Sequence, residues 1–87
     1  MKLTVKVFIG PWCPACEQAL PGITELLKSY DDISYEVIDA YSNTQLSDRY
    51  NISLLPTLIF EANENVVAKT EGKQLISLYT ELVDRWK

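Results

Sequence analysis

The 87-residue sequence contains no histidine and only two cysteines, Cys13 and Cys16. A structural zinc site takes four ligands, and most of them are cysteine or histidine side chains. A zinc site built on the two thiols would have to recruit two carboxylates, which makes metal binding a weak alternative. We expect neither a bound metal ion nor a bound cofactor.

Clusters of basic side chains are also missing. The sequence has 8 Lys and Arg residues against 12 Asp and Glu residues, a net charge of −4. Proteins that bind nucleic acid or an anionic membrane usually concentrate positive charge on one surface. The composition therefore predicts neither kind of partner.

No long apolar run is present either. A helix that crosses a bilayer needs roughly 18 or more consecutive apolar residues, and no segment approaches that length. The amino end, MKLTVKVFIG, places Thr4 and Lys6 inside what would have to be the apolar core of a signal peptide. We expect a cytoplasmic protein.

The residues that are present are typical of a globular domain. Apolar side chains make up 47% of the sequence and charged side chains 23%, which disfavours a disordered or fibrous chain. A chain this short buries only about 60% of the surface that it exposes when unfolded. We expect a single domain over residues 1–87, and a monomer.

The apolar pattern predicts four strands and two helices, and Ser42 predicts the cap of a third, short helix. Runs rich in Val, Ile and Phe indicate strands, and apolar residues spaced three and four apart indicate helices. The predicted elements are strand Lys2–Ile9, helix Pro14–Tyr30, strand Ile33–Tyr41, a short helix capped by Ser42 and ending near Tyr50, strands Thr57–Glu61 and Asn65–Thr70, and a last helix with the apolar face Leu75, Ile76, Tyr79, Leu82, Val83 and Trp86.

This order predicts an α/β fold. A strand–helix–strand crossover pairs its strands in parallel, whereas the short turn Ala62–Glu64 pairs its strands antiparallel. One four-stranded mixed sheet flanked by helices, in the order βαβ followed by αββα, satisfies both conditions.

Both cysteines lie in the stretch FIGPWCPACEQ, between the first strand and the first helix. A disulfide that closes so short a loop adds little stability, because it removes little freedom from the unfolded chain. The remaining interpretations are redox chemistry, half of a metal site, or two inert apolar fillers. A cytosolic cysteine pair at a solvent-facing helix start favours redox chemistry.

The start of the helix predicts different roles for the two thiols. With Cys13 at the N-cap, Pro14 takes the first helical position, where proline is favoured. Free backbone N–H groups and the helix dipole then favour the thiolate of Cys13, which we expect to be the nucleophile. Cys16 lies one turn further in and suits the resolving role. Trp12 either contacts a partner or packs against the protein, and the sequence leaves both possibilities open.

These features resemble the thioredoxin and glutaredoxin superfamily, from Val5 to about Trp86. The resemblance is carried by the segment WCPAC at 12–16, Pro21, the segment LLPT at 54–57, and Gly72. It implies a thioredoxin fold and a dithiol-disulfide oxidoreductase that reduces disulfide-containing proteins. Its electron donor would be either a thioredoxin reductase with NADPH or glutathione.

The resemblance also implies a surface for the target protein. In this family the proline that corresponds to Pro56 follows a cis peptide bond, and the residue before it, here Leu55, pairs with an extended target segment. The residues expected to contact the target are Trp12, Pro14, Leu55, Pro56 and Gly72.

The sequence departs from the family pattern at several positions. Val7 stands where thioredoxins usually carry a buried Asp, and Tyr35 stands where a Lys often accompanies it, so no internal base for Cys16 is evident. Pro14 directly after Cys13 is a glutaredoxin feature, yet the segment EGKQL at 71–75 lacks the acidic motif that holds glutathione in many glutaredoxins. Two alternatives remain: a glutathione-dependent glutaredoxin, and a redox-inert module that binds peptides.

Overall fold

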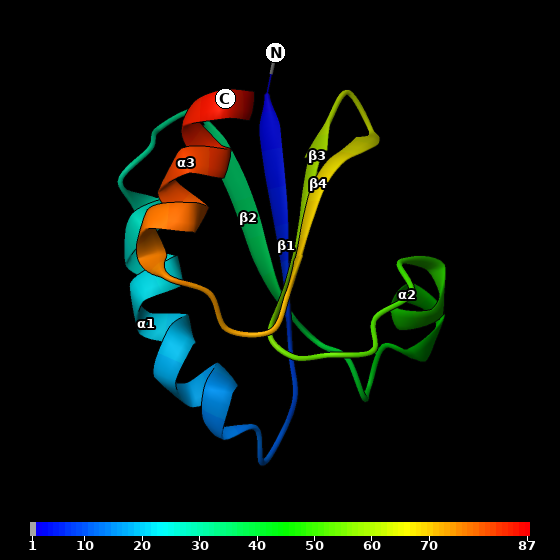
Figure 1. Cartoon of the computed structure of the whole chain (residues 1–87). Helices are drawn as coiled ribbons and strands as arrows, with labels where there is room; N and C mark the ends of the chain where they lie inside the picture. Colours follow the sequence, from blue (N-terminus) through cyan, green and yellow to red (C-terminus); the bar gives the residue numbers. More distant parts are fainter. Residues whose placement is uncertain (1) are drawn as a thin grey trace.

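The computed structural model describes residues 2–87 as a four-stranded sheet with helices on both faces (Figure 1). The elements in chain order are β1 (Leu3–Ile9), α1 (Pro14–Lys28), β2 (Ile33–Asp39), α2 (Thr44–Arg49), β3 (Thr57–Ala62), β4 (Asn65–Glu71) and α3 (Ile76–Trp86). The strand order is β2-β1-β3-β4. Strand β1 runs parallel to β2 and antiparallel to β3, and β3 and β4 are antiparallel. The predicted mixed α/β sheet is confirmed.

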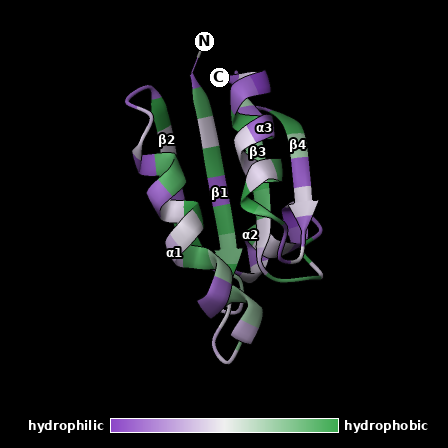
Figure 2. Ribbon diagram, turned by 60° about the vertical axis from the view of Figure 1, so that its left-hand side comes forward, coloured by the Kyte–Doolittle hydropathy of each residue, from purple (hydrophilic) through white to green (hydrophobic). Residues whose placement is uncertain are grey.

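Strand β1 lies in the middle of the sheet and contributes to both faces. Its sequence is mostly hydrophobic with polar interruptions (Figure 2), and alternate side chains of a strand point to opposite faces. Leu3, Val5 and Val7 are buried in the main core, on the side covered by α1 and α3.

Within residues 2–87, no helix combines the length and apolar character that crossing a bilayer requires.

A second, smaller core lies between the sheet and α2, on the opposite face (Figure 1). Four buried residues form it, and side chains from α2 and the loop that follows pack against them: Phe8, Ile38, Ala40 and Ile59 with Leu46, Tyr50, Ile52 and Leu55. This core holds the segment that leads from α2 to Pro56 against the sheet.

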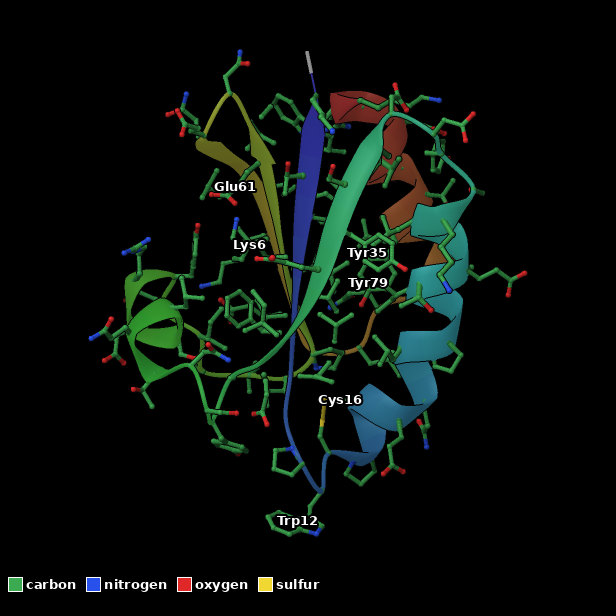
Figure 3. The ribbon with its side chains drawn as sticks, turned by 180° about the vertical axis from the view of Figure 1, so that it is seen from behind. Lys6, Trp12, Cys16, Tyr35, Glu61 and Tyr79 are labelled. Atoms are coloured by element: carbon green, nitrogen blue, oxygen red, sulfur yellow. A yellow bond between two sulfur atoms is a disulfide. The ribbon has the colours of Figure 1, made fainter. Side chains whose placement is uncertain are left out.

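Polar contacts beside this second core fix the carboxyl end of α2. The Lys6 ammonium pairs with the Glu61 carboxylate, and both side chains lie on the α2 side of the sheet (Figure 3). The Tyr50 hydroxyl donates a hydrogen bond to Glu61 Oε2 at 2.8 Å. Lys69 Nζ donates to the carbonyls of Tyr50 and Asn51, each at 3.1 Å. Side chains from β1, β3 and β4 therefore hold the carboxyl end of α2 in place.

This polar cluster changes the ionisation of its members. Burial alone would raise the pKa of the Glu61 carboxyl, but hydrogen bonds from Lys6 and Tyr50 outweigh it and hold that pKa below its usual value. Burial opposes the charged form of Lys6, and the contact with Glu61 overcomes this and raises the Lys6 pKa. Burial and the bond to Glu61 both raise the pKa of Tyr50.

The turn between β3 and β4 is tighter than predicted. Ala62 is the last residue of β3, so the turn consists of Asn63 and Glu64, not of three residues. Their φ angles are 53° and 66°. Two consecutive residues with positive φ form the turn type whose twist suits an antiparallel hairpin.

The predicted cap of α2 is wrong. Helix α2 begins at Thr44, and its N-cap residue is Asn43, whose side chain makes no capping hydrogen bond. Strand β2 ends at Asp39, two residues earlier than predicted, because the chain turns around that residue. Asp39 Oδ1 accepts the Tyr41 N–H at 2.9 Å, and the Asn43 side chain donates to the Asp39 carbonyl. This turn leaves Ser42 outside the helix.

The first part of the predicted apolar face of α3 is not buried. Leu75 is 77% exposed and Ile76 is 50% exposed, whereas Tyr79 and Val83 are fully buried. Leu75 precedes the helix in an extended conformation, and Ile76 lies over Gly22 on the exposed side of α1.

Helix α1 ends at Lys28, two residues before the predicted end.

The Glu61 cluster predicts an acid-sensitive contribution to stability. A carboxyl whose pKa is lowered by folding stabilises the protein above its unfolded pKa of about 4.3, and this contribution is lost as the pH falls through the folded value. We expect Glu61→Gln to lower the free energy of unfolding at neutral pH by about 1–3 kcal/mol. The variant should also lose less stability than the parent between about pH 5 and pH 3.

Denaturant titration over this pH range measures both effects. Glu81→Gln is the matched control, because Glu81 is an exposed partner of Arg85 one turn away on α3. It should change stability by less than about 0.5 kcal/mol. Identical pH profiles for the parent and Glu61→Gln would contradict the prediction.

Candidate active site

The two cysteines lie where β1 passes into α1. Cys13 is the N-cap residue of α1, with φ −108° and ψ 96°, and Pro14 is the first helical residue. The Cys16 N–H donates a hydrogen bond to Cys13 Sγ at 3.1 Å, and the Glu17 N–H donates to the Cys13 carbonyl at 3.1 Å. The predicted helix start at Cys13 is confirmed.

Cys13 and Cys16 form a disulfide bond, with their Cα atoms 5.2 Å apart. The separation lies within the usual range of about 4.4–6.8 Å, so the helix start brings the sulfurs together without a change of backbone. Cys13 is half-buried, whereas Cys16 is only 3% exposed. Of the two sulfurs, that of Cys13 is the one an external group can reach.

The backbone around Cys13 also suits a thiolate. The Cys16 N–H already points at Cys13 Sγ, and the amino end of α1 carries the positive end of the helix dipole. Both interactions become stronger when the sulfur is charged, because a hydrogen bond to an ionised acceptor is stronger than one to a neutral acceptor. The site can therefore stabilise Cys13 as a thiolate after the disulfide is reduced.

The loop before β3 lies beside the cysteine loop. The Leu55–Pro56 peptide bond is cis, as the resemblance implied. The Thr57 hydroxyl donates to the Leu54 carbonyl at 2.6 Å and closes the loop. Neither the amide nor the carbonyl of Leu55 hydrogen-bonds to another backbone group among residues 2–87. Among these residues the Leu55 backbone therefore has no pairing strand, and the Leu55 side chain lies against Gly10, just before the cysteine loop.

Gly72 lies at the same edge of the sheet. It follows Glu71 of β4, which pairs with Thr57, the residue after Pro56. Its φ of +78° favours glycine, and a side chain added there would meet no other atom within 4 Å. Lys73 Nζ donates to Gln18 Oε1 at 3.0 Å and ties the loop to α1. The pairing of Phe8 with Thr57 and of Thr57 with Glu71 thus places Pro56 and Gly72 at the end of the sheet where β1 leads into the cysteine loop.

Trp12 projects from the tip of the cysteine loop, away from the rest of the protein (Figure 3). Its side chain is 92% exposed, and its φ is 55°, an uncommon value for a non-glycine residue. The interpretation that Trp12 packs against its own protein is wrong. Pro14, on the other side of Cys13, is exposed as well.

The surroundings of Cys16 contain no buried acid. Val7 is fully buried on the sheet face covered by α1, and the half-buried Tyr35 packs against the same core. The buried polar or charged residues among residues 2–87 are Thr57 and Thr70, so no buried carboxylate lies below the thiols. Among the same residues, no three His, Cys, Asp or Glu side chains gather closely enough to hold a metal ion.

The structure adds two residues that the sequence analysis did not place at the site. A side chain at Gly10 would have its Cβ 2.8 Å from Leu55 Cδ1 and 2.9 Å from Tyr41 Cε2. Gly10 therefore leaves room for Leu55 and Tyr41 to approach the cysteine loop. In the sequence, Gly10 after an apolar run indicates only the end of a strand, and the apolar pattern places Tyr41 in a strand.

Comparison with known proteins identifies the family. The family described as Thioredoxin matches residues 1–84. Glutaredoxin-3 of Mus musculus is 33% identical over 70 residues, which cover 80% of this chain and 21% of that protein. Thioredoxin H5 of Oryza sativa subsp. japonica is 32% identical over 71 residues, which cover 82% of this chain and 53% of that protein.

A solved structure agrees with these matches over nearly the whole chain. The crystal structure of reduced Schistosoma mansoni thioredoxin pre-protein has a TM-score of 0.89 and 30% identity, and the match covers 99% of this chain and 80% of that one. The chain spans only about a fifth to a half of the two curated relatives, since the matches cover 21% and 53% of their lengths. The chain belongs to the thioredoxin family.

Proposed function

We propose that this chain is a protein-disulfide oxidoreductase that reduces target proteins by thiol–disulfide exchange. The observation that carries the proposal is the disulfide at the start of α1, in which Cys13 is accessible and Cys16 is buried. The helices and strands of residues 2–87 form one sheet and its covering layers, which supports a single domain as the working unit.

The reaction begins with the reduced protein. The Cys13 thiolate attacks one sulfur of the target disulfide, that bond breaks, and the other target sulfur leaves as a thiolate. Cys16 then gives up its proton and attacks Cys13 Sγ, which releases the second target sulfur and forms the Cys13–Cys16 bond. Two electrons pass from the cysteine pair to the target. The oxidised pair of the structure corresponds to the end of this reaction.

Target binding in this proposal uses the free edge at Leu55. An extended segment of the target adds to this edge by main-chain hydrogen bonds, as in other cases of strand addition. Trp12 and Pro14 flank the attacked disulfide on one side, and Pro56 and Gly72 support the segment on the other. The exposure of Trp12 and the unpaired backbone of Leu55 support this arrangement.

The oxidised pair needs a two-electron donor before the next reaction. The candidates are a thioredoxin reductase with NADPH and glutathione. The likeness to thioredoxins favours the first donor, whereas Pro14 and the likeness to glutaredoxin-3 favour the second. We propose that the protein works in a compartment that keeps thiols reduced, such as the cytosol, because reduction of targets then runs downhill.

Reduction of insulin disulfides tests the function. We expect the parent to reduce insulin, and Cys13→Ser to fall to the uncatalysed rate because the attacking thiolate is removed. Cys16→Ser should accumulate a mixed disulfide with insulin, detectable by mass spectrometry. Supplying thioredoxin reductase with NADPH, or glutathione, in separate reactions identifies the donor. A parent that binds insulin without reducing it would instead support the redox-inert binding module.

Alkylation of the reduced protein tests the roles of the two cysteines. Cys13 is the accessible sulfur with a helix N–H beside it, so we expect it to react with iodoacetamide well before Cys16 near neutral pH. The measurement is the alkylation rate against pH for the variants Cys13→Ser and Cys16→Ser. Faster alkylation of Cys16 would reverse the assignment.

Because Val7 offers no proton acceptor for Cys16, we expect attack by Cys16 on the mixed disulfide to be the slow step of the reaction. A carboxylate placed at Val7 would supply the missing proton acceptor, so we expect Val7→Asp to speed the decay of the mixed disulfide. The same change puts an unpaired acid into an apolar core and should destabilise the protein by up to several kcal/mol. Rapid quenching measures the first effect and denaturant titration the second.

The decay rate of the mixed disulfide in Val7→Asp shows whether the parent lacks a proton acceptor for Cys16. If Val7→Asp leaves the decay rate unchanged, another group already accepts the proton from Cys16. Glu17, in the first turn of α1, is then the next carboxylate to replace.

A further inference from the structure

Strand β2 is an outermost strand of the sheet, because it pairs with β1 alone. The backbone N–H and C=O groups of successive strand residues point to opposite sides of the strand. The Ala40 N–H donates to the Ile9 carbonyl, so the even-numbered residues of β2 are the ones that bond to β1. The N–H and C=O groups of Ile33, Tyr35 and Val37 therefore point away from the sheet.

No strand covers this outward row of groups. Among residues 2–87, no backbone group of a loop or helix cap bonds to Ile33, Tyr35 or Val37. The row ends at Asp39, whose carbonyl accepts a hydrogen bond from the Asn43 side chain at 2.9 Å. Each of the three residues thus presents one unpaired donor and one unpaired acceptor. An outermost strand with such a row can pair with a further strand.

The outermost strand on the other side, β4, differs from β2. Proteins commonly protect an outermost strand with lysine, proline or a bulge. Strand β4 carries Lys69, and a bulge between Phe60 and Glu61 interrupts its pairing with β3. Strand β2 contains neither lysine nor proline, and its register with β1 runs without a shift. The two sides of the sheet are therefore unequally protected, and β2 is the side that is open to pairing.

A second copy of β2 would satisfy the whole row. If two β2 strands run antiparallel about a two-fold axis at Tyr35, then Tyr35 pairs with Tyr35 of the second copy and Ile33 pairs with Val37. The two residues of a hydrogen-bonded pair exchange both of their N–H and C=O groups, so no group of the row remains unpaired. A shift of the register by two residues would instead pair the row with Asp31 or Asp39, outside it.

The side chains suit the same register. Ile33, Tyr35 and Val37 share the sheet face on which the β1 side chains form the main core. Val37 is 41% exposed, so Ile33 of the second copy would cover apolar surface there. On the other face, Glu36 comes opposite Ser34 and not opposite Glu36 of the second copy. The register therefore avoids placing like charges directly opposite each other.

We infer that β2 joins two copies of this chain side by side, so that their two four-stranded sheets form one continuous sheet. The occupant is a second copy, because the outward row complements itself completely about a two-fold axis. This dimer replaces the monomer expected from the sequence. Its formation is independent of the proposed function, since the row contains no residue of the cysteine site.

Sedimentation equilibrium over a range of protein concentrations up to millimolar tests the inference. A reductant keeps both thiols free, which excludes dimers linked by a disulfide, and moderate salt screens the net charge of −4 on each copy. We expect a reversible equilibrium between monomer and dimer. Val37→Asp should raise the Kd of the dimer at least about 10-fold, because the symmetry places two carboxylates against apolar side chains.

Val66→Asp is the matched control. It replaces the same type of residue with the same change of charge, Val66 is 51% exposed, and it lies on β4, at the other side of the sheet. It should change the Kd by less than about 2-fold. Neither valine belongs to either core, so we expect both variants to fold, which circular dichroism checks.

Amide hydrogen exchange, followed by NMR, locates the interface independently of any variant. The N–H groups of Ile33, Tyr35 and Val37 should exchange more slowly at high protein concentration than at low concentration. The N–H groups of Ser34 and Glu36 already bond to β1 and should change less. This measurement uses the parent alone, so it decides the inference even if Val37→Asp fails to fold.

Three results would overturn the inference: a monomer at every concentration, a dimer that Val37→Asp and Val66→Asp weaken equally, or a dimer whose formation leaves the exchange of the Tyr35 N–H unchanged. Insulin reduction is measured in parallel at a concentration at which the parent is monomeric. Val37→Asp should reduce insulin as fast as the parent there, so loss of the dimer and loss of the proposed function are distinguished.

Discussion

The direction in which each strand runs is the constraint on which the site depends. Because β1 and β2 are parallel, their carboxyl ends meet at one edge of the sheet, and the antiparallel β3 begins there. Strand β4 is antiparallel to β3, so its carboxyl end reaches the same edge. Four connections therefore converge, and they carry the cysteines, Tyr41, Leu55 and Gly72. Backbone contacts stabilise this end of the sheet: Phe8 pairs with Thr57, and the Ala40 N–H donates a hydrogen bond to the Ile9 carbonyl at 2.8 Å.

The two faces of the sheet perform different tasks. Helices α1 and α3 cover one face, where mostly apolar side chains form the main core. Helix α2 covers only part of the other face, and beyond it the sheet carries Lys6 and Glu61, beside an open cavity of about 520 Å³ lined largely by polar and charged residues. Charged side chains are suited to that uncovered part, since an exposed apolar surface there would promote association. The same pair also anchors α2 and so helps to hold the Leu55 loop.

Much of the fold could be predicted from the sequence, because the strands and helices follow local signals. Apolar periodicity placed the strands and helices α1 and α3, and the start of α1 after Cys13 followed from Pro14 and capping chemistry. Features that depend on tertiary contacts were missed. Nothing local shows that Asp39 turns the chain ahead of Ser42, that Leu75 precedes its helix in an extended conformation, or that Gly10 makes room for side chains from two distant segments. The residues proposed to contact the target came from the family resemblance.

The difference in environment between the two sulfurs explains how the proposed reaction can proceed without a buried acid. Cys16 is buried, and burial favours a neutral thiol over a thiolate, so its proton has to leave before it can attack. The first half of the reaction generates a base at the right place, because the target sulfur displaced by Cys13 leaves as a thiolate beside the cysteine loop. Transfer of the Cys16 proton to that sulfur balances the charge of both steps. A target held along Leu55 keeps the displaced sulfur close by, so target binding and proton transfer depend on the same edge of the sheet.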